Sequence, residues 1–200
     1  MRMLPGMVLP PKVYADGRGV QLMRGAIDGL FRPALVRNFI DRMWGIVVIL
    51  GKPKSRGSLR LASPRATDDA LIDPAYLEHP DDVAVLMNGV AKARRIAGGM
   101  ALAALGNREL IPGVMGQGEE GVLRSIKQNL MTTYHFAGTC KMGDEASAVV
   151  DRRLNVRGVS ALRIADASII PETPVSAMNA PSMMVGLRAA RFAVEDARGA

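Results

Sequence analysis

The order of the predicted elements is the strongest constraint on the fold of this chain. Helical and extended patterns follow one another without the regular strand–helix–strand alternation that builds a parallel sheet, which favours a mixed α+β architecture. Residues 1–31 are weakly patterned. After them, we expect helices at 32–43, 79–99, 119–131 and 180–196, and strands at 45–50, 58–63 and within 154–166, the first two strands pairing with each other.

The clearest single element is the helix within residues 79–99. Apolar residues recur every three or four positions from Val83 to Ile96, which is the spacing of one helix face. Acidic residues near its start and basic residues near its end complement the helix dipole. His79 stands at the N-terminal boundary, where a cap residue is a better interpretation than a metal ligand.

Composition is typical of a globular protein. The chain has 200 residues, of which 48% are hydrophobic and 22% charged, enough for one sizeable domain or two small ones. The longest apolar run, residues 44–50, is about a third of the length that spans a bilayer, so no membrane span is expected. A single cysteine excludes an internal disulfide and fits a reducing compartment, so we expect a cytoplasmic location.

The net charge of +7 raises nucleic acid as a partner. The basic residues are dispersed, however, and their densest groups, at 52–60 and 152–157, have neither interleaved aromatic residues nor zinc-finger spacing. Solvated surfaces, together with an acidic region on a partner, are therefore favoured, and no nucleic-acid partner is expected. A basic groove that binds a phosphate-bearing cofactor stays open as an alternative.

The stretch GQGEEG at 116–121 matches the spacing of a dinucleotide-binding fingerprint. That fingerprint requires a strand that leads into a tight turn and a helix. Here a Pro–Gly turn precedes it, and Glu119 and Glu120 would repel a pyrophosphate. We interpret them as first-turn acids of the following helix, so no nucleotide-binding strand–helix–strand unit is expected.

Residues 134–143, YHFAGTCKMG, contain one of the two histidines, His135, and the only cysteine, Cys140. His135 could be a catalytic group, a metal ligand or a packed side chain. A zinc site is poorly supported, because one cysteine and one histidine stand without neighbouring carboxylates. A Cys–His nucleophile pair is also disfavoured, since a cysteine in an apolar turn is usually a small buried hydrophobe. From this stretch alone, a structural histidine is favoured and no metal site is expected.

The C-terminal stretch from Arg163 runs through a proline-rich loop into an amphipathic helix. Asn179 is a natural N-cap, and Pro181 suits the first turn. The free N–H groups and the positive dipole end of such a helix would face whatever precedes Ala180, which favours an anion there.

Several ordered segments resemble the C-terminal signature of the glucose–methanol–choline (GMC) oxidoreductases, flavoenzymes that oxidise alcohols. The segments are YHFAGTCKMG, AVVDRRLNVRGVSALRIADASIIP and NAPSMMVG. Upstream, SRGSLRLAS and IDPAYLEHPDDVAVLMNGVAKAR are similar to substrate-domain segments of the family. The resemblance covers about residues 44–198.

The resemblance implies two parts. Residues 1–140 would form the substrate-binding domain, an antiparallel sheet with flanking helices, and residues 141–200 would supply strands and a helix that complete an FAD-binding domain. The implied cofactor is FAD, and the implied reaction moves a hydride from the CH–OH group of an alcohol to flavin N5. His135 would accept the hydroxyl proton or hold the alkoxide, and Asn179 would hydrogen-bond the alcohol oxygen.

The resemblance also implies cofactor contacts. Asp166 and Ala167 would lie near the ribityl chain and pyrophosphate. Asn179, Ala180 and Pro181, at the start of the last helix, would face the pyrimidine end of the flavin ring.

Two departures from the family pattern qualify these expectations. Ala177 replaces the first asparagine of the usual N-x-N-A-P loop, and the glycine-rich FAD fingerprint is missing. The chain therefore resembles the last part of a longer enzyme and is expected to be inactive without an N-terminal FAD-binding region, in the same polypeptide or a separate chain. The alternative is a non-catalytic binding module derived from such an enzyme, but retention of both His135 and Asn179 favours the enzyme.

Overall fold

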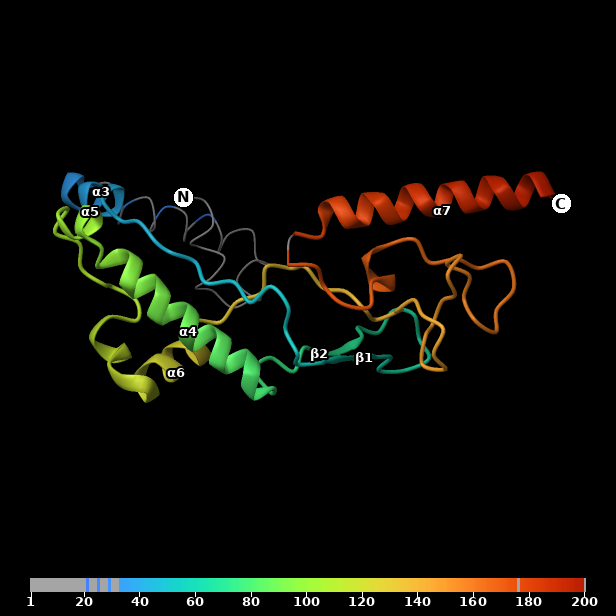
Figure 1. The fold of residues 1–200 in the computed structure, drawn as a ribbon, viewed down its shortest axis with the longest axis horizontal. Helices are drawn as coiled ribbons and strands as arrows, with labels where there is room; N and C mark the ends of the chain where they lie inside the picture. The colour runs from blue at the N-terminus through green and yellow to red at the C-terminus, as the bar shows by residue number, and fades with distance from the viewer. Residues whose placement is uncertain (1–20, 22–24, 26–28, 30–32, 176, 200) are drawn as a thin grey trace. The chain divides into compact units, whose positions relative to one another are not determined.

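The computed structural model describes residues 21, 25, 29, 33–175 and 177–199, and the chain divides into two compact units, Met1–Val47 and Val48–Ala200 (Figure 1). In the first unit, helix α3 spans Ala34–Asp41 and follows Pro33, whose fixed φ suits the start of a helix. This confirms the helix expected at 32–43. The weakly patterned segment 1–31 falls outside the described residues except at three positions.

The regular structure of the second unit begins with a short antiparallel pair. β1 (Ser58–Arg60) pairs with β2 (Leu71–Asp73), and every residue of both strands is exposed. Of the strand expected at 58–63, only 58–60 is present, and the expected half-buried face is not.

The expected pairing of that strand with residues 45–50 is wrong, because 45–50 form no strand. The physical reason is local. Asp68 accepts hydrogen bonds from Ser63 Oγ at 2.6 Å and from the Arg65 guanidinium at 3.0 Å, which closes a turn between 60 and 71. The turn brings β2, the nearer segment in sequence, beside β1. The 45–50 run then has no strand neighbour, and Val47 is 80% exposed.

Helix α4 (Pro80–Ala97) confirms the helix expected within 79–99. His79 is its N-cap, and its Nδ1 accepts a hydrogen bond from the Asp81 N–H at 3.1 Å. Leu86 is the buried centre of the expected apolar face. Helix α4 packs against α5 (Met100–Ala103) and α6 (Gly118–Asn129).

A buried carboxylate joins the start of α4 to the preceding loop. Asp82 accepts hydrogen bonds from the backbone N–H groups of Lys54 and Ser55, each at 2.8 Å, and from Ser55 Oγ at 2.6 Å. The residue is only 2% exposed. A buried charge is tolerated here because three donors and the positive end of the helix face it.

Helix α6 (Gly118–Asn129) confirms the helix expected at 119–131, although it ends two residues earlier. Glu119 and Glu120 lie in its first turn, and the 3₁₀ helix η2 (Gly113–Gly116) precedes it instead of a strand. GQGEEG is therefore a helix start and not a dinucleotide fingerprint, as expected.

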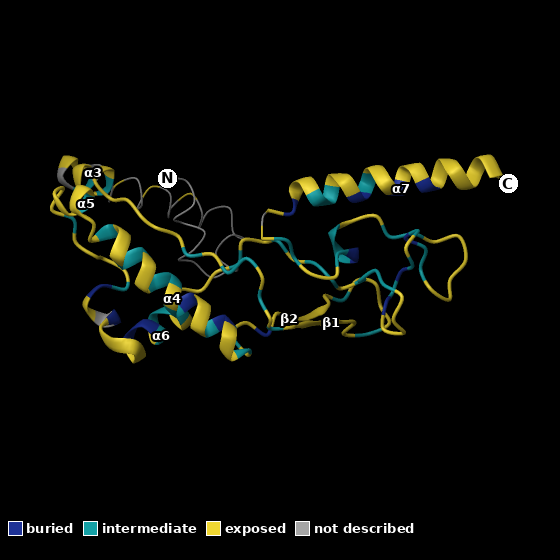
Figure 2. Cartoon of the chain, viewed as in Figure 1, coloured by how far each residue is buried: buried dark blue, intermediate teal, exposed yellow. Residues whose placement is uncertain are grey.

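The C-terminal part of the second unit is built around α7 (Asn179–Gly199), which confirms the helix expected at 180–196. One side of α7 packs on a small core with Val150 and Ile169 of the preceding loops (Figure 2). Ile169 belongs to the 3₁₀ helix η3 (Ala167–Ile169), which contacts α7. The core cluster consists of Val150, Leu154, Ile169, Val185, Ala189 and Phe192.

The strands expected within 154–166 are reduced to isolated bridges, Val150–Val156 and Asn155–Arg163. The carboxylate of Asp151 accepts hydrogen bonds from the N–H groups of Arg153 and Asn155. These side-chain bonds hold a turn, and they take backbone donors that a strand ladder would need. With its helices and one small antiparallel pair, the described chain is mixed α+β, as expected. Among its helices, none combines the length and the apolarity that crossing a bilayer requires.

Candidate active site

His135 lies in the irregular segment between α6 and the C-terminal core. Its side chain is half-buried, between the exposed Tyr134 and Phe136. Nδ1 of His135 accepts a hydrogen bond from the backbone N–H of Met178 at 3.4 Å. This contact joins two segments 43 residues apart in sequence and brings the imidazole next to the start of α7.

The start of α7 is held by Met178, which is 4% exposed. The carbonyl oxygen of Met178 accepts hydrogen bonds from the Ser182 N–H at 2.9 Å and from Ser182 Oγ at 2.7 Å. Met178 is therefore the N-cap, and the expectation that Asn179 is the cap is wrong by one residue. The reason is that Asn179 already lies inside the first turn that this bond closes. Its side chain is exposed and makes no hydrogen bond with the described residues.

The segment after His135 runs beside η3. The Cys140 N–H donates to the Ser168 carbonyl at 3.0 Å, and the Met142 N–H donates to the Ile169 carbonyl at 2.8 Å. Gly138 permits the approach with a φ of +87°, a left-handed conformation that glycine adopts without strain. Cys140 is half-buried, so the buried cysteine expected from the sequence is only partly covered; its backbone N–H faces η3.

The Asp166–Ala167 pair lies at the start of η3, on the segment that these hydrogen bonds tie to the loop of His135. Asp166 is exposed, and one of its carboxylate oxygens accepts from the Ser168 N–H at 2.8 Å and from Ser168 Oγ. The carboxylate therefore caps the 3₁₀ turn. Its second oxygen makes no hydrogen bond with the part of the chain that the structure describes.

The candidate site residues thus lie at two contacts, which share the loop of His135. His135 meets the start of α7, which carries Asn179, Ala180 and Pro181, and the loop of His135 meets η3, which carries Ala167 and adjoins Asp166. Sequence reasoning missed Met178, because it acts through its backbone N–H and leaves no signal in the sequence. It also missed the special role of Gly138, although a glycine in that loop could have suggested a left-handed turn.

The hydrogen bond from Met178 determines what His135 can do. Because Nδ1 accepts that bond, a neutral imidazole carries its proton on Nε2, and Nε2 donates to an oxygen placed before it. To take a proton at Nε2 instead, the ring must carry its hydrogen on Nδ1 and give up the contact with Met178. At 3.4 Å this contact is long for a hydrogen bond.

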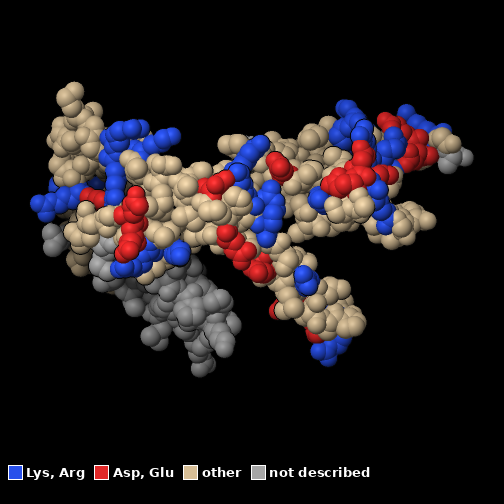
Figure 3. All heavy atoms as spheres, turned by 60° about the horizontal axis from the view of Figure 1, so that its bottom comes forward, with Lys and Arg blue, Asp and Glu red and all other residues tan. Residues whose placement is uncertain are grey.

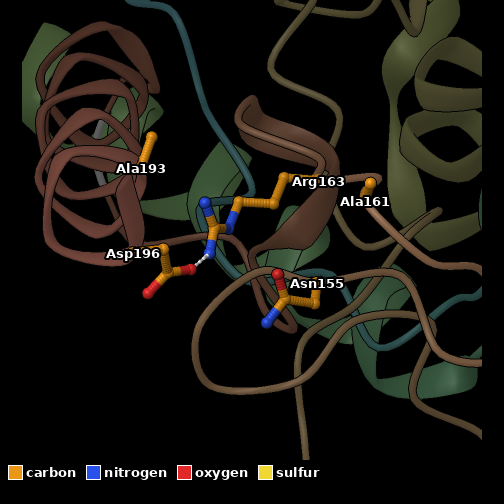
Figure 4. Close-up of a pocket in the computed structure, with 5 residues that line it drawn as sticks. All are labelled: Asn155, Ala161, Arg163, Ala193 and Asp196. Carbon is orange, nitrogen blue, oxygen red and sulfur yellow. Dashed lines mark hydrogen bonds and ion pairs between the residues drawn. The ribbon is translucent and has the colours of Figure 1, made fainter. Parts of the chain in front are cut away.

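A separate hollow of about 580 Å³ lies beside α7 (Figure 4), and no candidate residue lines it. Arg163 and Asp196 form an ion pair across it. Hydrogen bonds from Arg163 and then Arg153 hold the pKa of Asp196 below its usual range, so the pair fastens α7 to the preceding loop. The hollow is lined by Asn155, Ala161, Arg163, Ala193 and Asp196.

Neither charge on the face seen in Figure 3 nor metal-binding geometry indicates a second site among the residues that the structure describes. On the face seen in Figure 3, basic and acidic side chains are interspersed. Among residues 33–175 and 177–199 and the three described before them, no group of three or more His, Cys, Asp or Glu side chains could hold a metal ion.

Comparison with known proteins gives one consistent family. The GMC oxidoreductase family model matches residues 53–186. The chain is 38% identical to an alcohol dehydrogenase (acceptor) of Pseudomonas putida over 71% of its own length and 26% of the relative's. It is 40% identical to a choline oxidase of Arthrobacter globiformis over 68% of its length and 26% of the relative's.

Solved structures show the same likeness. The chain superposes on the pyridoxine 4-oxidase from Mesorbium loti with a TM-score of 0.65 at 33% identity, over 70% of this chain and 28% of that one. For an FAD-dependent oxidoreductase from Chaetomium thermophilum, the TM-score is 0.67 at 26% identity, over 74% and 26% of the two chains. The chain thus spans about a quarter of the length of the relatives that it matches.

Proposed function

The chain belongs to the GMC oxidoreductase family, whose cofactor is FAD, and we propose that it forms the alcohol-oxidising side of the active site in a flavin-dependent oxidoreductase. One observation carries the proposal. The His135 imidazole contacts the backbone N–H of Met178, the residue that immediately precedes Asn179, and this contact supports a shared site for His135 and Asn179. A binding module without redox chemistry has no need of this pair.

The residues at this place fit the flavin part of FAD. The N–H groups of Asn179 and Ala180 lie in the first turn of α7, where backbone donors have no partner within the helix. The dipole of a 21-residue helix adds positive potential at the same end. Such a donor set suits a heteroaromatic ring whose oxygen and nitrogen atoms accept hydrogen bonds and gain negative charge on reduction. The exposed side chains of Phe136 and Val175 supply apolar surface from the adjoining segments.

We propose that η3 contacts the ribityl and pyrophosphate part of FAD. Ala167 is half-buried and Asp166 exposed, and one carboxylate oxygen of Asp166 is engaged by Ser168. The remaining oxygen can accept a hydrogen bond from a ribityl hydroxyl. The backbone around Ala167 lies beside the loop of His135, so both parts of the cofactor would contact one continuous surface.

In the proposed mechanism, His135 handles the proton of the alcohol. FAD, when bound, supplies the hydride acceptor for the carbinol carbon. His135 Nε2 takes the hydroxyl proton when Nδ1 carries the ring hydrogen. Alternatively, once the hydroxyl proton has passed to solvent water, Nε2–H donates to the alkoxide while Nδ1 accepts from Met178. Asn179 donates its side-chain amide to the same oxygen and holds the substrate in one orientation. The imidazole can return its proton in each cycle, which suits a general base.

The proposal extends to the organisation of the enzyme. Residues 1–140 would form the substrate-binding domain and 141–200 would complete the FAD-binding domain. The chain's partners would be an alcohol and an N-terminal FAD-binding region, in the same polypeptide or a separate chain, and these residues would be inactive without that region. The cytoplasmic location expected from the single cysteine stays a prediction.

The test is a joined protein in which these 200 residues replace the matching quarter of the Pseudomonas putida relative. It should bind flavin and oxidise a primary alcohol. His135→Ala should lower kcat by about 10²- to 10⁴-fold, the range for loss of a general acid–base group, while flavin absorbance is retained. His79→Ala is the matched control, since that histidine caps α4 and its loss should leave kcat unchanged.

A second substitution separates the two roles of the imidazole. His135→Gln keeps a hydrogen-bond donor but cannot take a proton, so activity close to that of His135→Ala would indicate the base. Activity well above it would indicate donation to the alkoxide. A flavin-loaded joined protein that oxidises no alcohol would refute the proposed reaction and favour the binding module.

A further inference from the structure

Met178 connects His135 to a hydroxyl group of α7. Its N–H donates to His135 Nδ1 at 3.4 Å, and its carbonyl accepts from the Ser182 N–H at 2.9 Å and from Ser182 Oγ at 2.7 Å. The Oγ distance is typical of a well-formed O–H···O hydrogen bond. Ser182 is half-buried and lies in the first turn of α7. Two backbone groups of one residue therefore link this hydroxyl to the candidate catalytic histidine.

The link through Met178 is geometric. Its N–H and its carbonyl belong to different peptide units, and the dihedral angles φ and ψ alone determine their relative direction. The two bonds from Ser182 hold the carbonyl and so restrict ψ. Met178 is only 4% exposed, so its neighbours restrict rotation about φ. With both angles held, the N–H keeps one direction, toward the imidazole.

The segment before Met178 adds little hold of its own. Ala177 is exposed, and residue 176 lies outside the described residues. Between residues 171 and 177, the hydrogen bonds within the described chain comprise one contact, from Thr173 Oγ1 to the Gly51 carbonyl at 3.5 Å, which is long for a hydrogen bond. The direction of the Met178 N–H therefore depends on the helix side, where Ser182 lies.

The imidazole in turn depends on Met178. Tyr134, the residue before His135, has a φ of +61°, a left-handed conformation that is unfavourable for a residue with a side chain. Such conformations persist where the surrounding structure holds them. The ring of His135 makes no other hydrogen bond with residues that the structure describes, so the Met178 N–H is the polar contact that orients it.

A serine hydroxyl that bonds the carbonyl four residues earlier is common in helices. At most positions such a bond has only a local effect. Here its acceptor is the N-cap residue, whose N–H contacts the candidate catalytic side chain. The same local bond therefore acts on the site.

We propose that Ser182 is a positioning residue for His135; the inference rests on the proposed function. Ser182 Oγ holds Met178 so that its N–H stays directed at His135 Nδ1. An Nδ1 that accepts this bond keeps the hydrogen of the neutral ring on Nε2, and Nε2 then points in one direction. Ser182 needs no contact with the alcohol or the flavin for this role.

NMR of the ring nitrogens tests the proposal in the 200-residue chain. The chain has two histidines, so labelling with ¹⁵N-histidine gives two sets of ring signals, and His79→Gln assigns them. Spectra are recorded at about pH 9, where an ordinary histidine is neutral and protonated and unprotonated ring nitrogens differ in chemical shift.

Three variants are compared. Ser182→Ala removes the hydroxyl but keeps the backbone N–H that closes the first turn of α7. Ser182→Thr keeps the hydroxyl. Ser125→Ala is the matched control, because Ser125 is also a half-buried serine within a helix, α6. Circular dichroism measures the helix content of each variant.

In the wild type, His135 should carry its hydrogen mainly on Nε2. Ser182→Ala should shift the tautomer ratio toward Nδ1 by about two- to tenfold, the range for loss of one hydrogen bond, at unchanged helix content. Ser182→Thr and Ser125→Ala should keep the wild-type ratio.

An unchanged ratio in Ser182→Ala would overturn the proposal, as would Ser182→Thr behaving like Ser182→Ala. A wild-type ring that carries its hydrogen on Nδ1 would also overturn it. So would an equal shift in Ser125→Ala, or a shift accompanied by lost helix content, since either would indicate a general structural effect.

Alcohol turnover by the joined protein distinguishes this inference from the proposed function. There, Ser182→Ala should lower kcat by about two- to tenfold, with KM and flavin absorbance unchanged, because Nε2 no longer keeps one direction. A tautomer shift in the 200-residue chain, together with a joined protein that oxidises no alcohol, would support the link and refute the reaction. An active joined protein in which Ser182→Ala changes neither the tautomer ratio nor kcat would refute the role of Ser182 and leave the reaction standing.

Discussion

Removal of the Asp82 carboxylate should release the loop before α4. Asp82→Ala deletes the acceptor of the Lys54 and Ser55 N–H groups and of Ser55 Oγ. Both N–H groups then lose their partner in a place where the acceptor was 2% exposed. Opening of this loop should become much easier, while α4 keeps its cap at His79.

The size of the effect follows from the hydrogen bonds. A hydrogen bond to a charged group contributes about 1.5–3 kcal/mol. At about 1.4 kcal/mol for each factor of ten, the two amides should exchange with solvent about 10- to 150-fold faster in Asp82→Ala. Asp82→Asn should fall between the variant and the wild type, because it keeps an oxygen acceptor without the charge.

Hydrogen–deuterium exchange of a peptide spanning 52–57 measures the opening directly in the 200-residue chain. Asp81→Ala is the matched control: the neighbouring carboxylate pairs with Lys54 Nζ at the surface, where both side chains are more than half exposed. Such pairs contribute little, so exchange of the Lys54 and Ser55 amides should stay close to wild type. Exchange in Asp82→Ala as slow as in Asp81→Ala would refute the reasoning.

The same carboxylate sets a pH dependence. Burial acts to raise the pKa of Asp82, but hydrogen bonds from Lys54 and Ser55 outweigh it and leave the pKa below its usual value. A lowered pKa in the folded state stabilises the fold above the unfolded value, about 3.9, and the contribution is lost as pH falls through the folded pKa. The loop should therefore stay closed at pH 5 and open only in the more acidic range below about 4.

Three further outcomes are expected. Phe192→Ala should lower the free energy of unfolding of the C-terminal core by about 3–5 kcal/mol, because this ring is 9% exposed. Chemical denaturation followed by helix content measures the change, and a loss below about 1 kcal/mol would argue against the place of Phe192 in the core. Gly138→Ala should cost about 1–2 kcal/mol in the thermal stability of the joined protein, since φ is +87° there; unchanged stability would contradict that conformation. The Asp196 carboxylate should titrate below the usual aspartate range by NMR, and Arg163→Gln should move its midpoint upward; an unmoved midpoint would show that the ion pair has no effect.

Local patterns predicted the helices well because their information is local. In α4, the spacing of apolar residues, the acids of the first turn and the glycines at the end all lie within one segment, and the observed bounds, Pro80–Ala97, follow them. The same reasoning dismissed GQGEEG correctly, since what precedes Gly118 is visible in the sequence as a Pro–Gly turn. In α7 the cap was misplaced by one residue, because the bond from Ser182 to Met178 depends on a backbone geometry that composition does not reveal.

Pairing between segments was predicted less well. The strand at β1 was expected to pair with 45–50, yet the turn closed by Asp68 selects β2. The sequence does not distinguish between extended segments of similar composition as partners for β1. The pairing depends on which segment the chain can bring beside β1. The strands expected around Gly158 failed for a related reason: the side chain of Asp151 takes the backbone donors of a ladder into a turn.

The candidate site shows the same difference between what local sequence predicts and what tertiary contacts decide. Sequence motifs singled out His135, Asn179, Asp166 and their neighbours, because the identity of a residue determines the chemistry of its side chain. Only the tertiary structure could bring His135 to the start of α7 through the N–H of Met178, since every residue but proline carries that donor and no pattern marks which one is used. Likewise, the sequence predicts the helix α7, but only packing decides that the core covers Val185, Ala189 and Phe192 and leaves other apolar residues of the helix open.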